Sequence, residues 1–525
     1  MSTATLPHRR ALGESLVARW RSRLLRDRRA VGLAGLLVLT LVLRTRVLDT
    51  GFWIDDGISW GIASQPLGAI PDVLAQDGSP PLYYVLLRGW MALFESSEAT
   101  TYWLSILFAV ACVPAAVWAG WSLFGERAGW ACGALAAVTP FLTVYAGQAR
   151  MYTLVVLLSL VVAASFVGAF VHRDRRQLVV FALALTAAVY THNWALFLAV
   201  GTAAALVPCL WLAAPGPGRR VLLRDAALAF GAVALAFAPW LPTLLDQARS
   251  TGAPWSVVPT RTDLMRMPLN VLGVALLSPL TLAALAGWAG ERRRGRPRNL
   301  FVALVLLLLV ATTLVVGWQV GRFTSSWAER YVAVAVGPAL LLAGGGLAAV
   351  GRLGLLAALL AGLFWLPPAH IPSAAKSNVK ANLREIEAPL RRGDLVVGTQ
   401  PELVPVLRYY LGPAPRYASG FGPTPNPAVM DWRNALDRLE ATDPGTFARL
   451  LQQVPVGGRV VIVRPTGSAS AGPQWAQLID ERTGQWLRAL RSDRDFRIGP
   501  TYERETDTAR LSRVAVVVAR RVRDG

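Results

Sequence analysis

Long apolar segments recur along this sequence, and most of them are close to the length of a helix that crosses a lipid bilayer. Such a helix needs about 20 consecutive apolar residues. The chain has 525 residues, 54% of them hydrophobic, and its mean hydropathy is +0.43. A soluble domain of this size cannot bury that much apolar surface. The sequence therefore predicts a polytopic membrane protein.

The charge balance agrees with that class. Lys and Arg outnumber Asp and Glu by 53 to 32, a formal net charge of +21. In a soluble protein this excess would suggest nucleic acid, but arginine-rich cytoplasmic loops explain it in a membrane protein, and no nucleic-acid partner is expected. Cys112, Cys132 and Cys209 all lie in apolar segments, so we expect small buried side chains rather than disulfides or metal ligands.

We expect an all-α bundle of about eleven transmembrane helices. The segment 80–94, "PPLYYVLLRGWMALF", is apolar but short and contains Arg88, which predicts an interfacial or re-entrant helix instead of a span. With that segment excluded, every dense arginine cluster falls on the same side of the membrane. The predicted spans are 30–48, 102–123, 128–146, 152–171, 178–191, 194–213, 226–243, 268–289, 299–319, 331–350 and 353–368.

The arginine clusters also set the expected orientation, in a plasma (inner) membrane. Residues 1–29 form a basic tail that should stay in the cytoplasm, as should "HRDRRQ" at 172–177 and "ERRRGRPR" at 291–298. The transmembrane domain then covers residues 30–370, and its first extracytoplasmic loop covers 49–101. An odd number of spans places the C-terminal part of the chain outside.

From residue 371 to 525 the composition changes. Segments 394–399, 459–465 and 514–522 are short and rich in Val, which is typical of strands. "ELVPVLRYYL" and "QWAQLIDERTGQWLRALR" have the pattern of helices, and the Pro- and Gly-rich stretch "GPAPRYASGFGPTPNPA" is expected to separate elements. We predict a small extracytoplasmic α/β domain, and find no Gly-rich phosphate loop or His/Cys cluster in it.

Ionisable residues recur at the predicted outer ends of the spans. "GFWIDDGISWG" brings Asp55 and Asp56 just past the first span, and Asp77 follows in the same loop. "QARMY" (148–152), "THNW" (191–194) and "WAERY" (327–331) come at the outer ends of later spans. Ionisable groups from separate helices that meet on one face of the membrane indicate a functional site.

The order of these motifs resembles the GT-C superfamily of polytopic glycosyltransferases, in particular the branch of the protein O-mannosyltransferases and lipid A aminoarabinose transferases. The resemblance rests on an acid pair after the first span, "DGSPPLYY", "QARMY", "YTH" and a late "RY", and it covers roughly residues 30–370. It implies that 30–370 is a catalytic domain that transfers a sugar from a polyprenyl phosphate on the extracytoplasmic side.

The resemblance also implies roles for individual residues. Asp55 matches the first acid of the family's pair and is the expected catalytic base. Asp56 stands where Glu is more usual and Ser79 where His is common, so a divalent cation, with Asp56 as a ligand, is left open and no other cofactor is expected. Six further residues are expected to bind substrate along with Asp56 and Asp77: Tyr83, Arg150, Tyr152, His192, Arg330 and Tyr331.

The chemistry of these residues fits such a transfer independently of the resemblance. A carboxylate can take the proton of an acceptor hydroxyl, and Arg is suited to a departing phosphate. The expected partners are a polyprenyl-phosphate sugar donor, an envelope glycan, lipid or protein acceptor, and membrane lipids. A transporter or flippase of a lipid-linked sugar and a non-catalytic envelope assembly protein are the alternatives. The internal symmetry typical of many transporters is not evident in the sequence.

Overall fold

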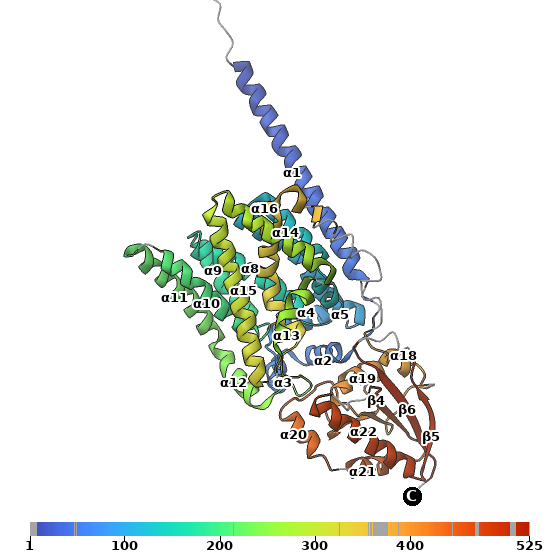
Figure 1. The fold of residues 1–525 in the computed structure, drawn as a ribbon. Coiled ribbons are helices and arrows are strands. Elements are labelled where there is room, and N and C mark those ends of the chain that lie inside the picture. The colour runs from blue at the N-terminus through green and yellow to red at the C-terminus, as the bar shows by residue number, and fades with distance from the viewer. Residues whose placement is uncertain are drawn as a thin grey trace, which may run out of the picture.

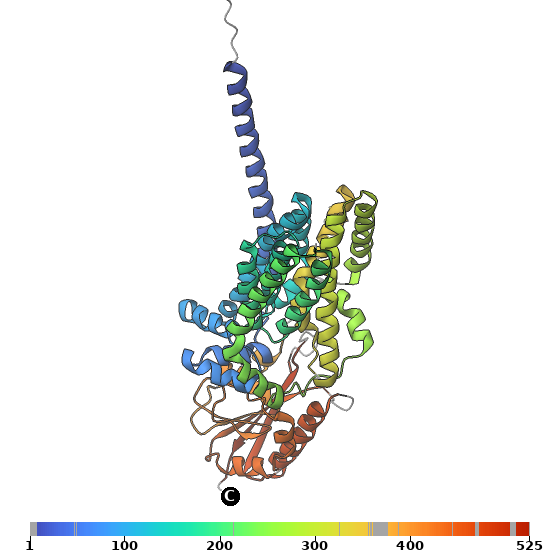
Figure 2. The ribbon, with the colours of Figure 1, turned by 90° about the vertical axis from the view of Figure 1, so that its left-hand side faces the viewer.

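The computed structural model describes residues 8–523 apart from 47, 49, 214, 273, 325, 355, 358–359, 361–375, 387, 444, 468–471 and 505–510. The described elements form a helical bundle with a sheet domain at one end (Figure 1). The N-terminal part of the first helix extends away from the opposite end of the bundle, as the view in Figure 2 also shows.

The bundle is built from long helices joined mostly by short connections. Their bounds are α1 (His8–Thr45), α5 (Glu98–Phe124), α6 (Glu126–Val138), α7 (Pro140–Ala146), α8 (Tyr152–Phe170), α9 (Arg176–Val189), α10 (Ala195–Leu212), α11 (Pro217–Phe237), α12 (Leu241–Ser250), α13 (Arg261–Leu272), α14 (Val274–Arg293), α15 (Pro297–Thr324) and α16 (Ala333–Val350). In the described residues, six helices are long and apolar enough to cross a membrane, and the bent pair α6 and α7 makes a seventh. The protein is a multi-pass membrane protein.

Six of the predicted spans coincide with these six helices: 102–123, 152–171, 194–213, 226–243, 299–319 and 331–350. The predicted span 128–146 is α6 and α7, which meet at an angle of 46° because Pro140 interrupts the helix. The predicted spans 30–48 and 178–191 fall mostly in α1 and α9, and 268–289 covers the end of α13 and most of α14. These helices are outside that set of six. Most of 353–368 lies outside the described residues, so the total of eleven stays a prediction.

Two boundaries differ from the sequence prediction. The span expected at 226–243 extends from Pro217 to Ser250, because α11 and α12 continue through the 3₁₀ turn η2 (Ala238–Trp240). Arg261 and Arg266, which lie between the predicted spans 226–243 and 268–289, are in helix α13. In the first case the helix continues into the polar flank of the apolar segment that hydropathy had marked.

Small residues let the central helices approach one another closely. A β-carbon on Gly120 of α5 or on Gly344 of α16 would lie 2.7 or 2.4 Å from the sulfur of Cys132 in α6. Packing between small residues is a common basis of helix association in membranes. Cys112, Cys132 and Cys209 are buried and free, which confirms the prediction made from their apolar surroundings.

Three short helices lie between the bundle and the sheet domain: α2 (Ile54–Ala63), α3 (Ile70–Asp77) and α4 (Leu82–Phe94) (Figure 1). Helix α4 is apolar but shorter than a span, as expected for 80–94. On α2, a β-carbon at Gly57 would collide with Val406, and one at Gly61 with the carbonyl of Ala428. Glycine at these two positions therefore lets α2 lie directly against the sheet domain.

The sheet domain contains a six-stranded sheet in the order β3-β2-β1-β4-β6-β5. Strand β1 is parallel to β2 and β4, while β3, β6 and β5 pair antiparallel to their neighbours. The predicted strands are confirmed as β1 (Leu395–Gly398), β4 (Arg459–Pro465) and β6 (Val514–Arg521). The sequence did not predict β2 (Arg416–Ser419) and β3 (Gly422–Pro423), which lie in the Pro- and Gly-rich stretch, or β5 (Phe496–Tyr502).

The two faces of the sheet have different partners. The predicted helices are present as α19 (Val404–Leu411) and α22 (Gln474–Ser492), together with α18 (Val379–Leu383), α20 (Ala435–Glu440) and α21 (Thr446–Gln452). Val396 and Val461 share one buried cluster with Phe52 and Tyr102 of the membrane part. On the other face, Ile462 packs with buried aromatic residues of α21 and α22. The first face thus joins the sheet domain and the bundle in one core.

Candidate active site

Asp55 and Asp56 are adjacent in the first turn of α2, but their carboxylates have different surroundings. Successive residues of a helix point about 100° apart, since 3.6 residues make a turn. The side chain of Asp55 lines a cavity and is 13% exposed, whereas that of Asp56 is fully buried. The two acids therefore do not form one paired site.

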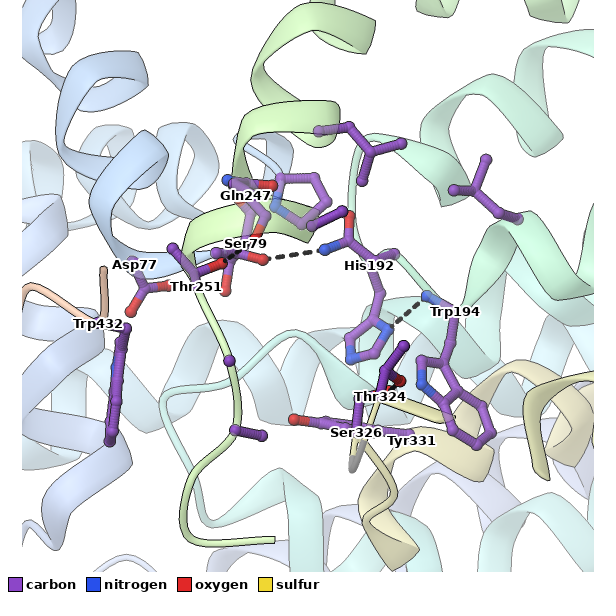
Figure 3. A pocket seen from close by; sticks show the side chains of 18 of the residues that line it. Asp77, Ser79, His192, Trp194, Gln247, Thr251, Thr324, Ser326, Tyr331 and Trp432 are labelled. Atoms are coloured by element: carbon purple, nitrogen blue, oxygen red, sulfur yellow. Dashed lines mark hydrogen bonds between the residues drawn. The ribbon is translucent and has the colours of Figure 1, made fainter. Parts of the chain in front are cut away.

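The main cavity has a volume of about 560 Å³ and lies where the bundle meets the sheet domain. Its wall comes from α2, the α3–α4 loop, the α7–α8 turn, the α9–α10 loop and the start of α10, α12 and the loop after it, the end of α15, and the segment before α16. The sheet domain contributes Trp432 (Figure 3). Six residues predicted from the sequence line it together: Asp55, Asp77, Arg150, His192, Arg330 and Tyr331.

Asp55 lies between two arginines. Its Oδ2 is 3.8 Å from the Nε of Arg150 and 3.8 Å from the Nε of Arg330. Within the described part of the chain, none of these three buried atoms has a hydrogen-bond partner. A buried polar group without a partner costs about 1–3 kcal/mol, so such groups are expected to receive a ligand.

Arg150 is held from behind by other side chains. Its Nη1 donates to the hydroxyl of Tyr84 at 3.2 Å and to Ser59 Oγ at 3.4 Å. Its carbonyl accepts from Ser105 Oγ at 3.1 Å, and that hydroxyl also pairs with Tyr83 at 3.1 Å. Tyr83, a predicted substrate contact, is fully buried behind Arg150 and is not among the residues that line the main cavity.

Arg330 rests on aromatic rings. Its guanidinium carbon is 4.6 Å from the ring centroid of Trp255 and 5.6 Å from that of Tyr331. Cation–π contacts of this kind hold the charged group while its N–H groups remain available. The cavity wall therefore presents two cations on either side of one carboxylate.

Asp77 lies at the end of α3, in the loop that carries the two prolines. The amides of Asn193 and Gln247 donate to the carbonyls of Gly78 and Leu74 and fix the loop. Burial raises the pKa of Asp77 above its ordinary value, and Arg150 opposes that shift. Asp77 is thus a second carboxyl group in the same cavity.

His192 is a neutral hydrogen-bond donor in this cavity. Its Nδ1 accepts the backbone N–H of Trp194 at 3.1 Å, so the ring proton is on Nε2 (Figure 3). Burial and the nearby Arg150 and Arg330 lower its pKa to about 3. The ring lies 4.9 Å from that of Tyr331 and 5.9 Å from that of Tyr152.

Tyr152 lies just behind the cavity wall. Its ring packs on Tyr145 with centroids 4.9 Å apart, and the guanidinium of Arg150 is 5.8 Å from its centroid. Its buried hydroxyl has no hydrogen-bond partner among the residues described. Tyr152 therefore contacts Arg150 and His192 of the cavity wall but does not itself line the cavity.

Asp56 is enclosed by the protein. Its Oδ1 accepts the backbone N–H of Ala149 at 2.7 Å, and its Oδ2 accepts the Tyr102 hydroxyl at 3.1 Å and the Lys376 ammonium at 2.5 Å. Lys376 also donates to the carbonyl of Gly147 and lies 3.8 Å from the centroid of the Tyr102 ring. Burial raises the pKa of Asp56, and the Lys376 charge opposes that shift.

We call Asp56, Tyr102, Ala149 and Lys376 the Asp56 cluster. Because both carboxylate oxygens of Asp56 are used in it, they are not free to hold a substrate or a cation as predicted. In the described residues, no group of three or more His, Cys, Asp or Glu side chains is arranged to hold a metal.

Sequence reasoning missed Lys376, Trp255 and Trp432. One signal for the first was present, since Lys376 and Lys380 are the only two lysines in the chain. Both pair with acids in or next to the first predicted loop, Lys376 with Asp56 and Lys380 with Glu98 at 2.9 Å. The two tryptophans come from loops, and no pattern in the sequence places them in the cavity.

No protein-family model and no curated protein matches this sequence, whereas solved structures match its fold. ArnT from Cupriavidus metallidurans in the apo state matches with a TM-score of 0.58 at 14% identity, over 94% of this chain and 98% of ArnT. The chain has the fold of GT-C glycosyltransferases. This confirms the fold implied by the motif order.

Two further GT-C structures match along nearly the whole of this chain. ArnT from the same organism bound to undecaprenyl phosphate has a TM-score of 0.56 at 14% identity, over 93% of this chain and 97% of ArnT. The arabinofuranosyltransferase AftD from Mycobacteria has a TM-score of 0.52 at 14% identity, over 95% of this chain but 40% of AftD. At this identity, the likeness establishes the GT-C fold alone.

Proposed function

We propose that the protein is a membrane glycosyltransferase that moves a sugar from a polyprenyl phosphate to a hydroxyl group, with Asp55 as the base. The observation that carries this proposal is the carboxylate of Asp55 between Arg150 and Arg330, all three with unpaired polar atoms among the described residues. The GT-C fold supports it. A carboxylate next to two cations meets the two needs of the reaction, a proton acceptor and a stabilised leaving phosphate.

In this reaction, the acceptor oxygen attacks the anomeric carbon of the donor sugar. A new carbon–oxygen bond forms, the bond from that carbon to the phosphate oxygen breaks, and Asp55 takes the proton of the acceptor hydroxyl. Arg150 and Arg330 stabilise the charge on the departing polyprenyl phosphate. His192 is neutral and donates from Nε2, so it can bind a phosphate oxygen without adding charge.

Apolar residues of α10 and α15 suit the lipid part of the donor. Leu196 and Phe197 line the main cavity from α10, and Val320 and Phe323 line it from α15. Phe323 is 84% exposed, at the end of a helix that is long and apolar enough to cross a membrane. The cavity therefore has an apolar side next to its arginines, as a polyprenyl phosphate requires. ArnT binds undecaprenyl phosphate in one of the matching structures.

We also propose that the cavity faces the extracytoplasmic side. The arginine-rich turns at 172–177 and 291–298 follow the ends of α8 and α14 that lie away from the sheet domain (Figure 1). Since such turns stay in the cytoplasm, residues 1–29 would be a cytoplasmic tail, 30–370 the catalytic domain, and 371–525 an extracytoplasmic domain. Reporter fusions at 175, 295 and 400 test this. Residue 400 should report outside, and a cytoplasmic signal there contradicts the orientation.

A panel of radiolabelled polyprenyl-phosphate hexoses and pentoses tests the proposed function. The purified protein, supplied with an envelope extract as acceptor, should consume one donor and release polyprenyl phosphate. The Asp55→Asn variant is the matched control and should consume none at the same protein level. Movement of an intact donor across vesicles without release of polyprenyl phosphate would contradict transfer and identify a transporter.

A further inference from the structure

A second cavity adjoins the main one between the bundle and the sheet domain. It has a volume of about 360 Å³ and shares Gly252, Ala253, Thr324 and Trp432 with the main cavity. We call it the side cavity. Resting on the proposed function, we propose that the side cavity and the wall of the main cavity at Trp432 form an acceptor site for a carbohydrate chain, with the ring of Trp432 as the platform for a sugar.

The wall of the side cavity is fixed by the backbone. The N–H of Trp432 donates to the carbonyl of Gln76 at 2.9 Å, and that of Asn434 donates to the carbonyl of Ser250 at 2.7 Å. Thr251 and Arg433 form an isolated antiparallel bridge between these two contacts. Asn434 has a φ of 47°, a left-handed conformation that Asn tolerates better than most residues. The sheet domain thus presents Trp432 in a defined position relative to α3 and α12.

The lining of the side cavity suits sugar hydroxyl groups. Three hydroxyls, two amides and one carboxylate line it, from Ser250, Ser256, Thr324, Asn434, Gln474 and Asp437. A sugar hydroxyl both donates and accepts hydrogen bonds, and this set of side chains offers both donors and acceptors. Besides Trp432, the apolar members of the lining are Ala253, Pro254, Ala435, Leu436 and Pro473, of which only Leu436 has a branched aliphatic side chain. That composition suits an acyl chain poorly.

Trp432 provides the flat apolar surface that a sugar ring needs. It is 8% exposed, and Trp475 supports it from the sheet domain with ring centroids 5.8 Å apart. Figure 3 shows its indole edge-on beside Asp77, at the wall of the main cavity. The carbon–hydrogen face of a sugar can pack on such a ring while its hydroxyls reach a carboxylate at the rim. Asp77 is placed to accept from those hydroxyls.

The same geometry favours a glycan over a peptide acceptor. An extended peptide is usually bound through hydrogen bonds to its backbone, often at a strand edge. The residues that line the side cavity come from loops, helix ends and the short helix α20, and none belongs to a described strand. A sugar chain that runs past Trp432 would bring its terminal hydroxyl toward Asp55. The sheet domain would then select the acceptor, while the bundle holds the donor.

Saturation-transfer NMR with the full-length protein in detergent tests this assignment. The probes are methyl disaccharides of a hexopyranose and of a pentofuranose, and a Ser/Thr peptide as the competing class. The wild type and Trp432→Phe should bind one of the disaccharides, whereas Trp432→Leu should bind it about tenfold more weakly, because it loses the flat ring. Trp211→Leu, on an 81% exposed residue of α10, is the matched control and should bind normally.

A surface variant keeps the test valid if Trp432→Leu fails to fold. Gln474→Ala changes an exposed side chain of the side cavity and should also weaken disaccharide binding. Undiminished binding by every folded variant, or binding of the peptide but of neither disaccharide, overturns the inference.

Donor consumption is measured separately, so that the glycan site and the proposed function can fail independently. If donor is consumed without Trp432-dependent sugar binding, the glycan site is wrong and the proposed function stands. If sugar is bound in a Trp432-dependent way but no donor is consumed, the glycan site stands and the proposed function is wrong.

Discussion

Helix α2 carries adjacent carboxylates on two faces, and these carboxylates differ in their exposure to the cavity and in their hydrogen-bond partners. On the cavity face, Asp55 is 3.8 Å from two arginine nitrogens, and its Oδ2 has no partner in the described residues. On the buried face, Asp56 accepts from a lysine, a tyrosine and a backbone N–H. One carboxylate is available for chemistry, and the other is already used by the fold.

The difference shows how to separate catalytic from structural acids in a pair that the sequence presents as equal. Groups that the protein leaves unpaired lower its stability and are expected where a ligand will complete them. Groups with a full set of partners hold elements together. The Asp56 cluster joins α2, α5, the α7–α8 turn and the segment before α18, and so fixes the turn that carries Arg150. Substitutions on the two faces of α2 should therefore have different consequences.

The largest expected effect is that of Asp55→Asn. The amide keeps the size of the side chain but cannot take a proton, and loss of a general base typically lowers the rate about 10²–10⁴-fold. Because Asp55 has no full set of partners among the described residues, the melting temperature should not fall. Transfer rate and melting temperature are measured on the same preparation. If the melting temperature fell together with the transfer rate, Asp55 would have a structural role like that of Asp56.

The next effect is on stability and concerns the buried ion pair. Lys376→Met leaves Asp56 as an uncompensated buried charge, which typically costs about 3–5 kcal/mol. The double variant Asp56→Asn with Lys376→Met should recover part of the loss, because neither charge then remains. Lys380→Met is the matched control, since its partner Glu98 is less buried. Thermal unfolding in detergent measures all three; equal losses for Lys376→Met and Lys380→Met would be inconsistent with a special role for the Asp56 cluster.

A smaller effect is expected from Arg150→Lys and Arg330→Lys. An ammonium keeps the charge but cannot present two N–H groups in a plane to phosphate oxygens. We expect the donor KM to rise about tenfold in each variant, equivalent to about 1.4 kcal/mol. Arg249→Lys, on a residue that also lines the main cavity, is the control. An unchanged donor KM would remove the arginine concerned from the phosphate site.

The last effect concerns His192 and the dependence of stability on pH. Its folded-state pKa of about 3 lies below its ordinary value of 6.5, so the unfolded chain binds the proton first as pH falls. The wild type should therefore lose stability as pH falls below 6.5, by at most about 1.4 kcal/mol per pH unit from this residue. As the pH falls from about 6.5 to about 5, the free energy of unfolding of His192→Gln should decrease less than that of the wild type. Identical pH profiles for the two proteins would show that His192 is not buried in its neutral form.

Much of the bundle could be predicted because hydropathy is a local property. Segments such as α8 and α15 are apolar over the length of a bilayer, and their bounds differ from the prediction by only a few residues. The sheet was less predictable. Strands β2 and β3 lie in a stretch rich in Pro and Gly. Strand β2 forms because β1 offers it a parallel partner, and β3 pairs with β2.

The cavity could be predicted in outline because helix ends on one side of a membrane must lie near one another. That reasoning placed Asp55, Arg150 and Arg330 together. It could not separate Asp55 from Asp56, since Lys376 lies 320 residues away along the chain. It also could not tell which of the adjacent Tyr83 and Tyr84 contacts the Arg150 guanidinium, because that depends on how α4 packs on α5.

Binding of the donor phosphate tests the central claim most directly, since it separates the base from the cations in one measurement. Radiolabelled undecaprenyl phosphate is titrated against the wild type, Asp55→Asn and Arg150→Gln, each checked for an unchanged melting temperature. We predict that Asp55→Asn binds it at least as tightly as the wild type, because a negative charge next to the phosphate is removed, and that Arg150→Gln binds it at least about tenfold more weakly. Loss of binding in Asp55→Asn, or wild-type binding in Arg150→Gln, would contradict the account.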